Sequence, residues 1–335
     1  MRIALDAMGG DYAPQEIIKG ALEALEAFPY LEKVFLVGQE EKIKDYIKNE
    51  NPKIEIVNAT EIIEMDDHPS IAYRRKKDAS ISVATKLVKN GEADAVVSAG
   101  STGGQMVAAL FGLGRIKGVE RPAIGTVLPT LKGGKLLLDA GANADAKVKN
   151  LGQFALMGSV YAEKVLGITN PKVALVNIGA EKTKGNELSI KAYELLEQMK
   201  TINFVGNIEG RDIPQGKADV FVCDGFVGNI ILKLAEGMAS ALGDLLKEEI
   251  NKSTRSKVGA ALMMPALKSF KSRLDYAEYG GAPLLGVDGL SIICHGSSKA
   301  KAIRNAIRVA YECHNNKFVE TLKANLQVEW INNEL

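Results

Sequence analysis

Loops rich in glycine and small polar residues follow predicted strands at six places in the chain. They are the segments 6–11, 98–104, 139–143, 177–187, 223–229 and 294–298. Together they offer backbone N–H groups, small hydroxyls, the amides of Asn143 and Asn229, and one cation, Lys184. Such groups bind a small oxyanion such as phosphate. Any one of these loops is a common turn, but the whole set at the edge of one sheet predicts a phosphate site.

The segment VFVCDGFVGNIILKLAEG (220–237) shows the expected geometry. An apolar strand ends on Cys223-Asp224-Gly225, and an apolar stretch with helical spacing starts at Asn229. A strand, a short glycine loop and a helix expose backbone N–H groups at the start of the helix. This geometry suits an anion.

The loops do not carry the motifs of a nucleotide cofactor. No GxGxxG follows the first strand, and no GxxxxGK[ST] occurs. The segment 112–118 is similar to GxGxxG, but it follows a helical run and has the wrong spacing. Three histidines, His68, His295 and His314, show none of the spacings of metal ligands. We therefore expect neither a cofactor nor a metal.

A nucleophilic side chain is not indicated either. The chain has no GxSxG elbow. Cys294 and His295 are adjacent in the sequence, so in a strand they point to opposite faces and cannot easily act as nucleophile and base. Aspartates at strand ends, such as Asp6 and Asp139, are expected to cap turns or helices.

Length and composition indicate a globular α/β protein with a large core. The chain has 335 residues, of which 46% are hydrophobic and 25% charged. A net charge of +1 predicts no nucleic-acid partner. Three cysteines without a CxxC motif suit a reducing cytoplasm. The first residues do not resemble a secretory signal, and no apolar run approaches the ~20 residues of a membrane span. We therefore expect a cytoplasmic protein.

Apolar strands alternate with helical segments along most of the chain. Strands are predicted over 2–7, 33–38, 53–59, 93–100, 172–179 and 218–225. Helices are predicted to begin at Pro14 and to cover about 146–166. Continuous apolar strands separated by helices are typical of a parallel sheet with helices on both faces.

The stretch from 225 to 270 breaks this alternation because its pattern is almost entirely helical. Within it, basic residues flank an apolar group. We predict a helical hairpin that projects from the α/β body and forms a dimer interface or touches a membrane surface. The alternative is a helix pair packed on the sheet. The residues expected at the membrane are Val258, Leu262, Met263 and Leu267.

Seven short motifs in a fixed order resemble those of one known family. They are DAMGGD (6–11), VSAGSTG (97–103), LDAGAN (138–143), NIGAEKTKG (177–185), DGFVGNIILK (224–233), YGGAPLLGVDG (279–289) and HGSS (295–298). Over essentially its whole length the sequence resembles the bacterial phosphate acyltransferases of phospholipid synthesis, also called acyl-ACP:phosphate transacylases. It departs from the family pattern at Gly104-Gln105, where alanine and an apolar residue are expected. This departure would alter the packing of the helix start.

The resemblance implies a fold, a reaction and partners. The fold would be a three-layer α/β/α sandwich with a mostly parallel sheet, similar to phosphate acetyltransferases and to the isocitrate dehydrogenase group. The reaction would move a fatty acyl group from acyl carrier protein to inorganic phosphate. A membrane acyltransferase would then use the acyl phosphate to acylate glycerol 3-phosphate. Family members are cytoplasmic homodimers that associate peripherally with the membrane.

In such a reaction phosphate is itself the nucleophile, so the protein must hold phosphate and then the oxyanion in a preorganised cage of donors. Lys184 is the candidate for binding phosphate and neutralising charge in the transition state. Asn229 is the candidate for donating to the thioester carbonyl oxygen or positioning phosphate. The structural alternatives are a solvated Lys184, a helix-capping Asn229 and a hydrogen-bonded strand-end histidine at His295. Further candidates for phosphate or pantetheine contacts are Thr102, Gly103, Asn143, Gly185, Gly225, Gly228, His295 and Ser297.

Carrier protein is acidic, so a basic surface near the site is expected to steer it. The segment YRRKKDAS (73–80) is the first candidate for this surface. A second candidate comprises Lys252, Arg255, Lys257, Lys268, Lys271 and Arg273. Ordinary solvated faces are the alternative for both.

We expect one catalytic unit over 1–335, divided into two lobes with the cleft between them. The first lobe would comprise 1–100 and 285–335, the second 101–284, with 225–270 projecting. Three other functions are alternatives. They are a phosphate acetyl- or butyryltransferase using acyl-CoA, a nicotinamide-dependent decarboxylating dehydrogenase, and a membrane-associated scaffold that binds phosphate without turnover.

Overall fold

The computed structural model describes residues 1–47 and 51–328 and contains two mostly parallel sheets. The first sheet has the strand order β3-β2-β1-β4-β12-β11-β5. Its strands are β1 (Arg2–Asp6), β2 (Lys33–Gly38), β3 (Ile54–Asn58), β4 (Ala95–Ser98), β5 (Ala123–Ile124), β11 (Ala282–Leu285) and β12 (Ser291–Ile293). All neighbouring strands pair in parallel except β11, which is antiparallel to both β12 and β5.

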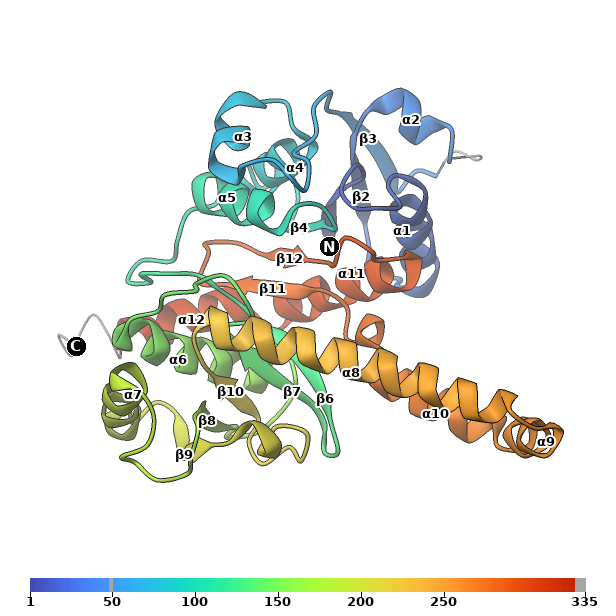
Figure 1. The fold of residues 1–335 in the computed structure, drawn as a ribbon. Coiled ribbons are helices and arrows are strands. Elements are labelled where there is room, and N and C mark those ends of the chain that lie inside the picture. The colour runs from blue at the N-terminus through green and yellow to red at the C-terminus, as the bar shows by residue number, and fades with distance from the viewer. Residues whose placement is uncertain (48–50, 329–335) are drawn as a thin grey trace.

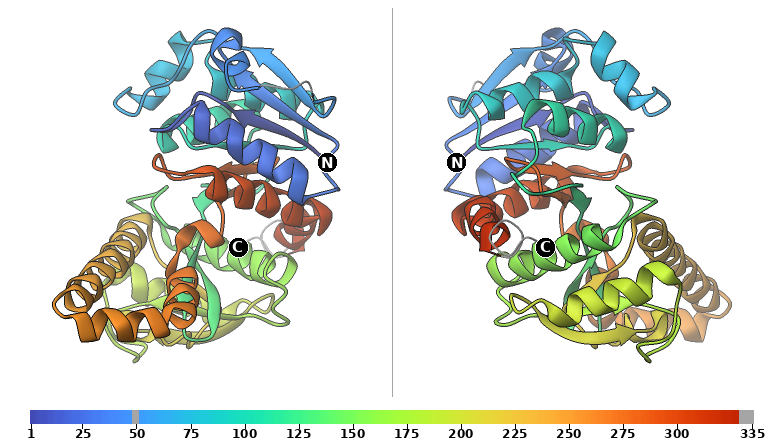
Figure 2. Two further views of the ribbon diagram at one scale, coloured as in Figure 1. Left: turned by 90° about the vertical axis from the view of Figure 1, so that its right-hand side faces the viewer. Right: turned by 90° about the vertical axis from the view of Figure 1, so that its left-hand side faces the viewer.

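The second sheet has the order β6-β7-β10-β8-β9. Its strands are β6 (Thr126–Thr130), β7 (Gly133–Leu138), β8 (Lys172–Val176), β9 (Asn203–Ile208) and β10 (Val220–Val222). Only β6 runs antiparallel to its neighbour. A single residue, Gly125, separates β5 of the first sheet from β6 of the second. In Figures 1 and 2 the first sheet and its helices lie above the second sheet.

Helices cover both faces of each sheet. They are α1 (Gln15–Ala27), α2 (Glu40–Lys44), α3 (Pro69–Arg75), α4 (Ser80–Lys89), α5 (Thr102–Gly112), α6 (Val148–Lys164), α7 (Glu187–Gln198), α8 (Gly225–Asn251), α9 (Thr254–Leu262), α10 (Met264–Leu274), α11 (Ala300–Asn315) and α12 (Phe318–Leu326). On the first sheet, Ile3 of β1 packs in the cluster that contains α1 and α11, whereas Ala4 packs in the cluster that contains α3 and α4. Successive strand residues thus bury on opposite faces, as a three-layer α/β/α arrangement requires.

One apolar core continues from the first sheet to the second. It joins Ile303 of α11, on the first sheet, to Leu136 and Phe154 of β7 and α6, on the second. On the other face of the second sheet, Phe221 of β10 packs with Ile231 in the first turns of α8. The start of α8 is therefore held against the sheet.

The rest of α8 leaves the body of the protein. In Figure 1 it extends to the right, α9 lies at the tip, and α10 returns alongside it. The predicted projecting hairpin is confirmed. The expectation that no apolar run approaches a membrane span is corrected. By length and composition alone the 27-residue α8 could cross a membrane, and 11% of its 18-residue apolar stretch is buried.

Candidate active site

The glycine-rich loops form two groups, not one. Strands β1, β4 and β12 are parallel neighbours in the first sheet, so loops 6–11, 98–104 and 294–298 share its carboxyl edge. Strands β7, β10 and β8 are parallel neighbours in the second, so the other three loops share that edge. The prediction of a single sheet edge was wrong because the strands divide between two sheets.

Asp139 organises the loop after β7. Its side chain is fully buried, and Oδ1 accepts hydrogen bonds from the backbone N–H groups of Ile124, Gly141 and Ala142 at 3.0–3.1 Å. Its Oδ2 accepts from Asn143 N at 2.7 Å and from Asn143 Nδ2 at 2.9 Å. A carboxylate that accepts so many donors fixes the loop and is not presented to a ligand.

Asp139→Asn is expected to destabilise the protein by about 2–4 kcal/mol, because the amide NH₂ would face N–H donors in either orientation. The free energy of unfolding in urea measures this loss. Asp145→Asn is the matched control, since Asp145 is exposed in the same loop. Equal unfolding midpoints for the two variants would contradict the assigned role of Asp139.

The predicted site residue Asn143 is also committed to this loop. Besides its bonds to Asp139, its Nδ2 donates to Pro122 O at 2.8 Å, and its backbone oxygen accepts from Gly225 N at 2.7 Å. A phosphate oxygen can use Nδ2 only by breaking these bonds. The structure thus gives Asn143 a role in joining two loops, and its contact with phosphate stays a prediction.

Gly225 and Gly228 let α8 start directly against the loop after β7. A Cβ atom at Gly228 would lie 1.8 Å from Asp139 O, and one at Gly225 would lie 2.7 Å from Asn143 N. Gly225 N donates to Asn143 O, and Gly228 N donates to Asp224 O. The Asp224 side chain caps the helix by accepting from Val227 N at 2.9 Å. Close packing therefore explains both glycines without a ligand.

Asn229 lies on the exposed side of the helix start. A Cβ atom at Gly141 (φ 143°) would be 3.5 Å from Asn229 Oδ1, so Asn229 faces the loop after β7. One turn further along α8, Lys233 Nζ lies 3.5 Å from His295 Nε2. Residues four apart share a helix face. This face of α8 therefore connects the carboxyl edges of the two sheets, which carry the glycine-rich loops and are called the loop edges.

Lys184 lies in the neighbouring loop, after β8. Asn177 holds this loop, since its Nδ2 donates to Lys184 O at 2.9 Å and its Oδ1 accepts from Ile178 N at 2.8 Å. Gly185 has a φ of 103°, and a Cβ atom there would be 2.0 Å from Ser189 Oγ. The loop is thus tightly specified, whereas the Lys184 side chain is exposed.

The loops after β1 and β4 of the first sheet pack closely because Gly9 has no side chain. A Cβ atom at Gly9 would lie 2.6 Å from Gly100 N. Thr102 is the first residue of α5, whose N-cap Ser101 accepts from Gly104 N at 3.3 Å. The candidate Gly103 lies against Pro69, because a Cβ atom there would be 2.5 Å from Pro69 Cγ.

The Gly104-Gln105 departure from the family pattern has a structural effect. Gln105 is buried, and its Nε2 donates to Ser291 Oγ at 3.0 Å and to Ile292 O at 2.9 Å. The glutamine therefore ties α5 to β12 by hydrogen bonds where an apolar residue would have packed.

The remaining two candidates contact each other in the loop after β12. His295 Nδ1 lies 2.8 Å from Ser297 Oγ, and Ser297 N donates to the same nitrogen at 3.2 Å. With Lys233 near the other ring nitrogen, His295 is oriented from both sides.

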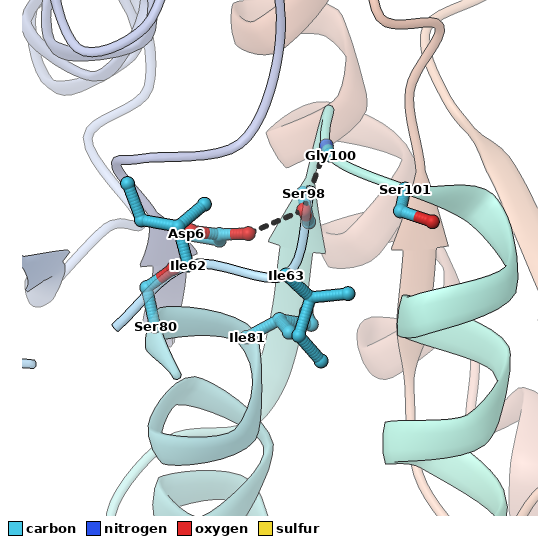
Figure 3. A pocket seen from close by; sticks show the side chains of 8 residues that line it. All are labelled: Asp6, Ile62, Ile63, Ser80, Ile81, Ser98, Gly100 and Ser101. Atoms are coloured by element: carbon cyan, nitrogen blue, oxygen red, sulfur yellow. Dashed lines mark hydrogen bonds between the residues drawn. The ribbon is translucent and has the colours of Figure 1, made fainter. Parts of the chain in front are cut away.

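Asp6 is a buried carboxylate whose position the sequence did not reveal. Its Oδ2 accepts from Ser98 Oγ at 2.7 Å, and Ser98 Oγ accepts from Gly100 N at 3.0 Å (Figure 3). The adjoining cavity is about 10 Å³, which is room for one water molecule. Burial raises the pKa of Asp6, and hydrogen bonds from Ser80 and Ser98 oppose this shift. Asp6 therefore holds the loops after β1 and β4 together.

The three cysteines are buried and poorly suited to nucleophilic catalysis. Burial raises the pKa of Cys294 to about 12 and also raises the pKa values of Cys223 and Cys313. Thiolates, which are the reactive form, are therefore scarce near neutral pH.

Comparison with known proteins identifies the family. The family model described as "Fatty acid synthesis protein" matches residues 1–321. The phosphate acyltransferase of Desulfitobacterium hafniense strain DCB-2 is 62% identical over 329 residues, covering 97% of this chain and 98% of that protein. The chain belongs to the phosphate acyltransferase family. The phosphate acyltransferase of Heliobacterium modesticaldum is 59% identical over 330 residues, with 97% and 98% coverage. The predicted resemblance is confirmed, and this family member is an acyltransferase enzyme.

Solved structures confirm the predicted fold class. A phosphotransacetylase from Streptococcus pyogenes matches with a TM-score of 0.63 at 18% identity, covering 96% of this chain and 94% of that one. The EutD phosphotransacetylase from Staphylococcus aureus gives 0.61 at 17% identity, with 94% coverage of both chains. At these identities the likeness concerns the α/β fold alone.

Proposed function

We propose that this acyltransferase moves a fatty acyl group from acyl carrier protein to inorganic phosphate. The acyl phosphate would then serve a membrane glycerol-3-phosphate acyltransferase in phospholipid synthesis. The observation that carries the proposal is the face of α8 on which Asn229 meets Gly141 and Lys233 meets His295. A substrate bound there contacts loops from both sheets, as a reaction between two substrates requires.

The reaction needs no covalent acyl-enzyme. A phosphate oxygen attacks the thioester carbonyl carbon, a C–O bond forms, and the C–S bond breaks to release the thiolate. Thiols have pKa values near ~8.5, so the thiolate leaves without a strong general acid. Lys184 binds phosphate and offsets its charge, while Asn229 donates to the carbonyl oxygen as it becomes an oxyanion or positions phosphate.

The other candidates have supporting roles in this proposal. Thr102 and Gly103 at the start of α5, Gly185 beside Lys184, and the His295–Ser297 pair contact phosphate or the pantetheine arm. Asn143, Gly225 and Gly228 act through the shape of the loops, because their polar groups bond within the protein.

A comparison of thioester donors tests the proposed function. The purified protein is mixed with phosphate and either an acyl-carrier thioester or the matching acyl-CoA, and acyl phosphate is trapped with hydroxylamine. We expect a higher kcat/KM with the carrier thioester. Product from acyl-CoA alone would identify a phosphate acetyl- or butyryltransferase instead.

We further propose that the hairpin tip, defined as 258–267, rests on a membrane surface. Leu262 is 80% exposed, and Val258 and Met263 are also exposed. Basic side chains, including Arg255 and Lys257, flank these residues and suit anionic lipid. Peripheral association of a cytoplasmic enzyme would deliver its apolar product directly to the bilayer.

Leu262→Glu combined with Leu267→Glu is expected to release the protein from anionic vesicles in a sedimentation assay while activity in solution persists. The reason is the cost of burying a charge in the acyl region. Leu131→Glu is the matched control because Leu131, in the β6–β7 turn, is 79% exposed. Undiminished vesicle binding by the double variant would refute membrane contact through the tip.

A homodimer is also proposed. An apolar stripe runs along the exposed face of α8 at helical spacing. It comprises Phe226, Ile230, Leu234, Met238, Leu242 and Leu245, each more than half exposed. A large apolar face of this kind is typical of an interface between subunits.

A further inference from the structure

A second, larger cavity lies away from both loop edges, between α3, α4 and α5. Its volume is about 270 Å³, and its lining includes Tyr73, Lys77, Lys86, Lys89 and Gly112. In Figure 1 these three helices lie at the upper left, on the opposite side of the molecule from the projecting hairpin. The cavity is therefore separate from the proposed membrane contact.

The charges around this cavity are positive and poorly balanced. Lys77, Lys86 and Lys89 supply three ammonium groups, and no lining residue is acidic. Lys77 Nζ lies 5.5 Å from the centroid of the Tyr73 ring, and Lys89 Nζ donates to a backbone oxygen at 3.3 Å. The lining residue Asn90 donates through Nδ2 to the acidic Glu92 at 3.0 Å. Grouping these cations costs electrostatic free energy unless an anionic partner offsets it.

Of the basic segment 73–80, Tyr73 and Lys77 line the cavity. Lys76 forms an ion pair with Asp67 at 2.5 Å and donates to Ile62 O at 2.7 Å, so its charge is already compensated. Lys77, the next residue, turns instead toward the cavity and joins the two lysines of α4. The basic group at the cavity therefore combines one lysine of the segment 73–80 with two lysines of α4.

Apolar and polar groups complete the cavity. Phe111, near the end of α5, is 64% exposed, and its ring centroid is 5.7 Å from that of Tyr73. The hydroxyl oxygen of Ser82 is buried without a partner among the described residues, and Ser82 lines the cavity. An exposed aromatic ring beside a group of cations and an unsatisfied hydroxyl is typical of a surface that binds a partner.

We infer that this cavity docks an acidic protein that carries the acyl thioester, with carboxylate side chains entering among the three lysines. The inference rests on the proposed function and names the docking surface of its donor. Helix α5 runs from Thr102 at the loop edge to Gly112 at the cavity, a span of about 15 Å at ~1.5 Å per residue. A thioester on a long flexible arm can cross this distance while its carrier stays docked.

Charge reversal tests this inference. Lys86→Glu combined with Lys89→Glu is expected to raise KM for the carrier thioester about tenfold or more, with kcat little changed. The KM for acyl-CoA stays as in the wild type, because a small donor needs no protein docking. The dependence of carrier kcat/KM on salt also becomes weaker. The control is Lys19→Glu with Lys200→Glu, which changes net charge equally at exposed lysines elsewhere.

A second variant, Phe111→Ser, changes no charge and is expected to raise the same KM. Equal KM values for the carrier thioester in the lysine variant and its control would rule out docking at this cavity and would leave the proposed function intact. No turnover of carrier thioester by the wild type, with turnover of acyl-CoA, would overturn the proposed donor and the docking surface with it.

Discussion

Asn229→Ala is expected to lower kcat for acyl phosphate formation by about 100-fold or more, the usual effect of losing one oxyanion donor. Asn229 is exposed at the start of α8 and faces Gly141, so its amide is available to a substrate between the two loop edges. Initial rates of hydroxamate formation, at saturating thioester and phosphate, measure the loss.

The same substitution should leave stability nearly unchanged, since the cap of α8 is Asp224 and not Asn229. Asn251→Ala, at the other end of the helix, is the matched control. A rate for Asn229→Ala close to that of this control would show that Asn229 only packs at the helix start.

Lys184→Ala is expected to lower kcat/KM for phosphate by about 100-fold or more, because the substitution removes the cation that binds the attacking anion. Lys184→Arg keeps the charge but changes its geometry, so we expect partial recovery. The measurement is the phosphate dependence of the initial rate at fixed thioester.

Lys182→Ala is the control for this prediction because Lys182 lies in the same loop and pairs with Glu197. The two substitutions change net charge equally, so a general electrostatic effect would alter both rates alike. Similar rates for the two variants would mean that Lys184 is an ordinary solvated lysine.

The secondary structure was largely predictable from local pattern. Continuous apolar strands such as 33–38 and the helical stretch after 225 correspond to β2 and to the hairpin. The division into two sheets was not predictable, because it depends on pairings between distant residues. Strand β12, for example, pairs with β4 although more than half of the chain lies between them, and Gln105 bonds to β12 across 186 residues.

The loops of the candidate site could be predicted from the sequence, but the contacts and relative positions of their residues could not. Gly225 and Gly228 were candidates for phosphate or pantetheine contacts, and in the structure they allow close contact with the protein's own backbone. Asp139 was expected to cap a turn, and in the structure its carboxylate accepts hydrogen bonds from several N–H groups of the loop after β7. The approach of Lys233 to His295 and the grouping of three lysines at the cavity between α3, α4 and α5 arise only from tertiary packing, so no spacing in the sequence indicated them.

Release of free thiol from a long-chain acyl-carrier thioester, followed with and without inorganic phosphate, distinguishes direct attack by phosphate from a covalent acyl-enzyme. Direct attack by phosphate predicts thiol release only when phosphate is present, in equal amount to trapped hydroxamate, with no change in the intact mass of the protein. Stoichiometric thiol release without phosphate, accompanied by a gain of one acyl group in protein mass, would reveal a covalent acyl-enzyme and rule out direct attack by phosphate.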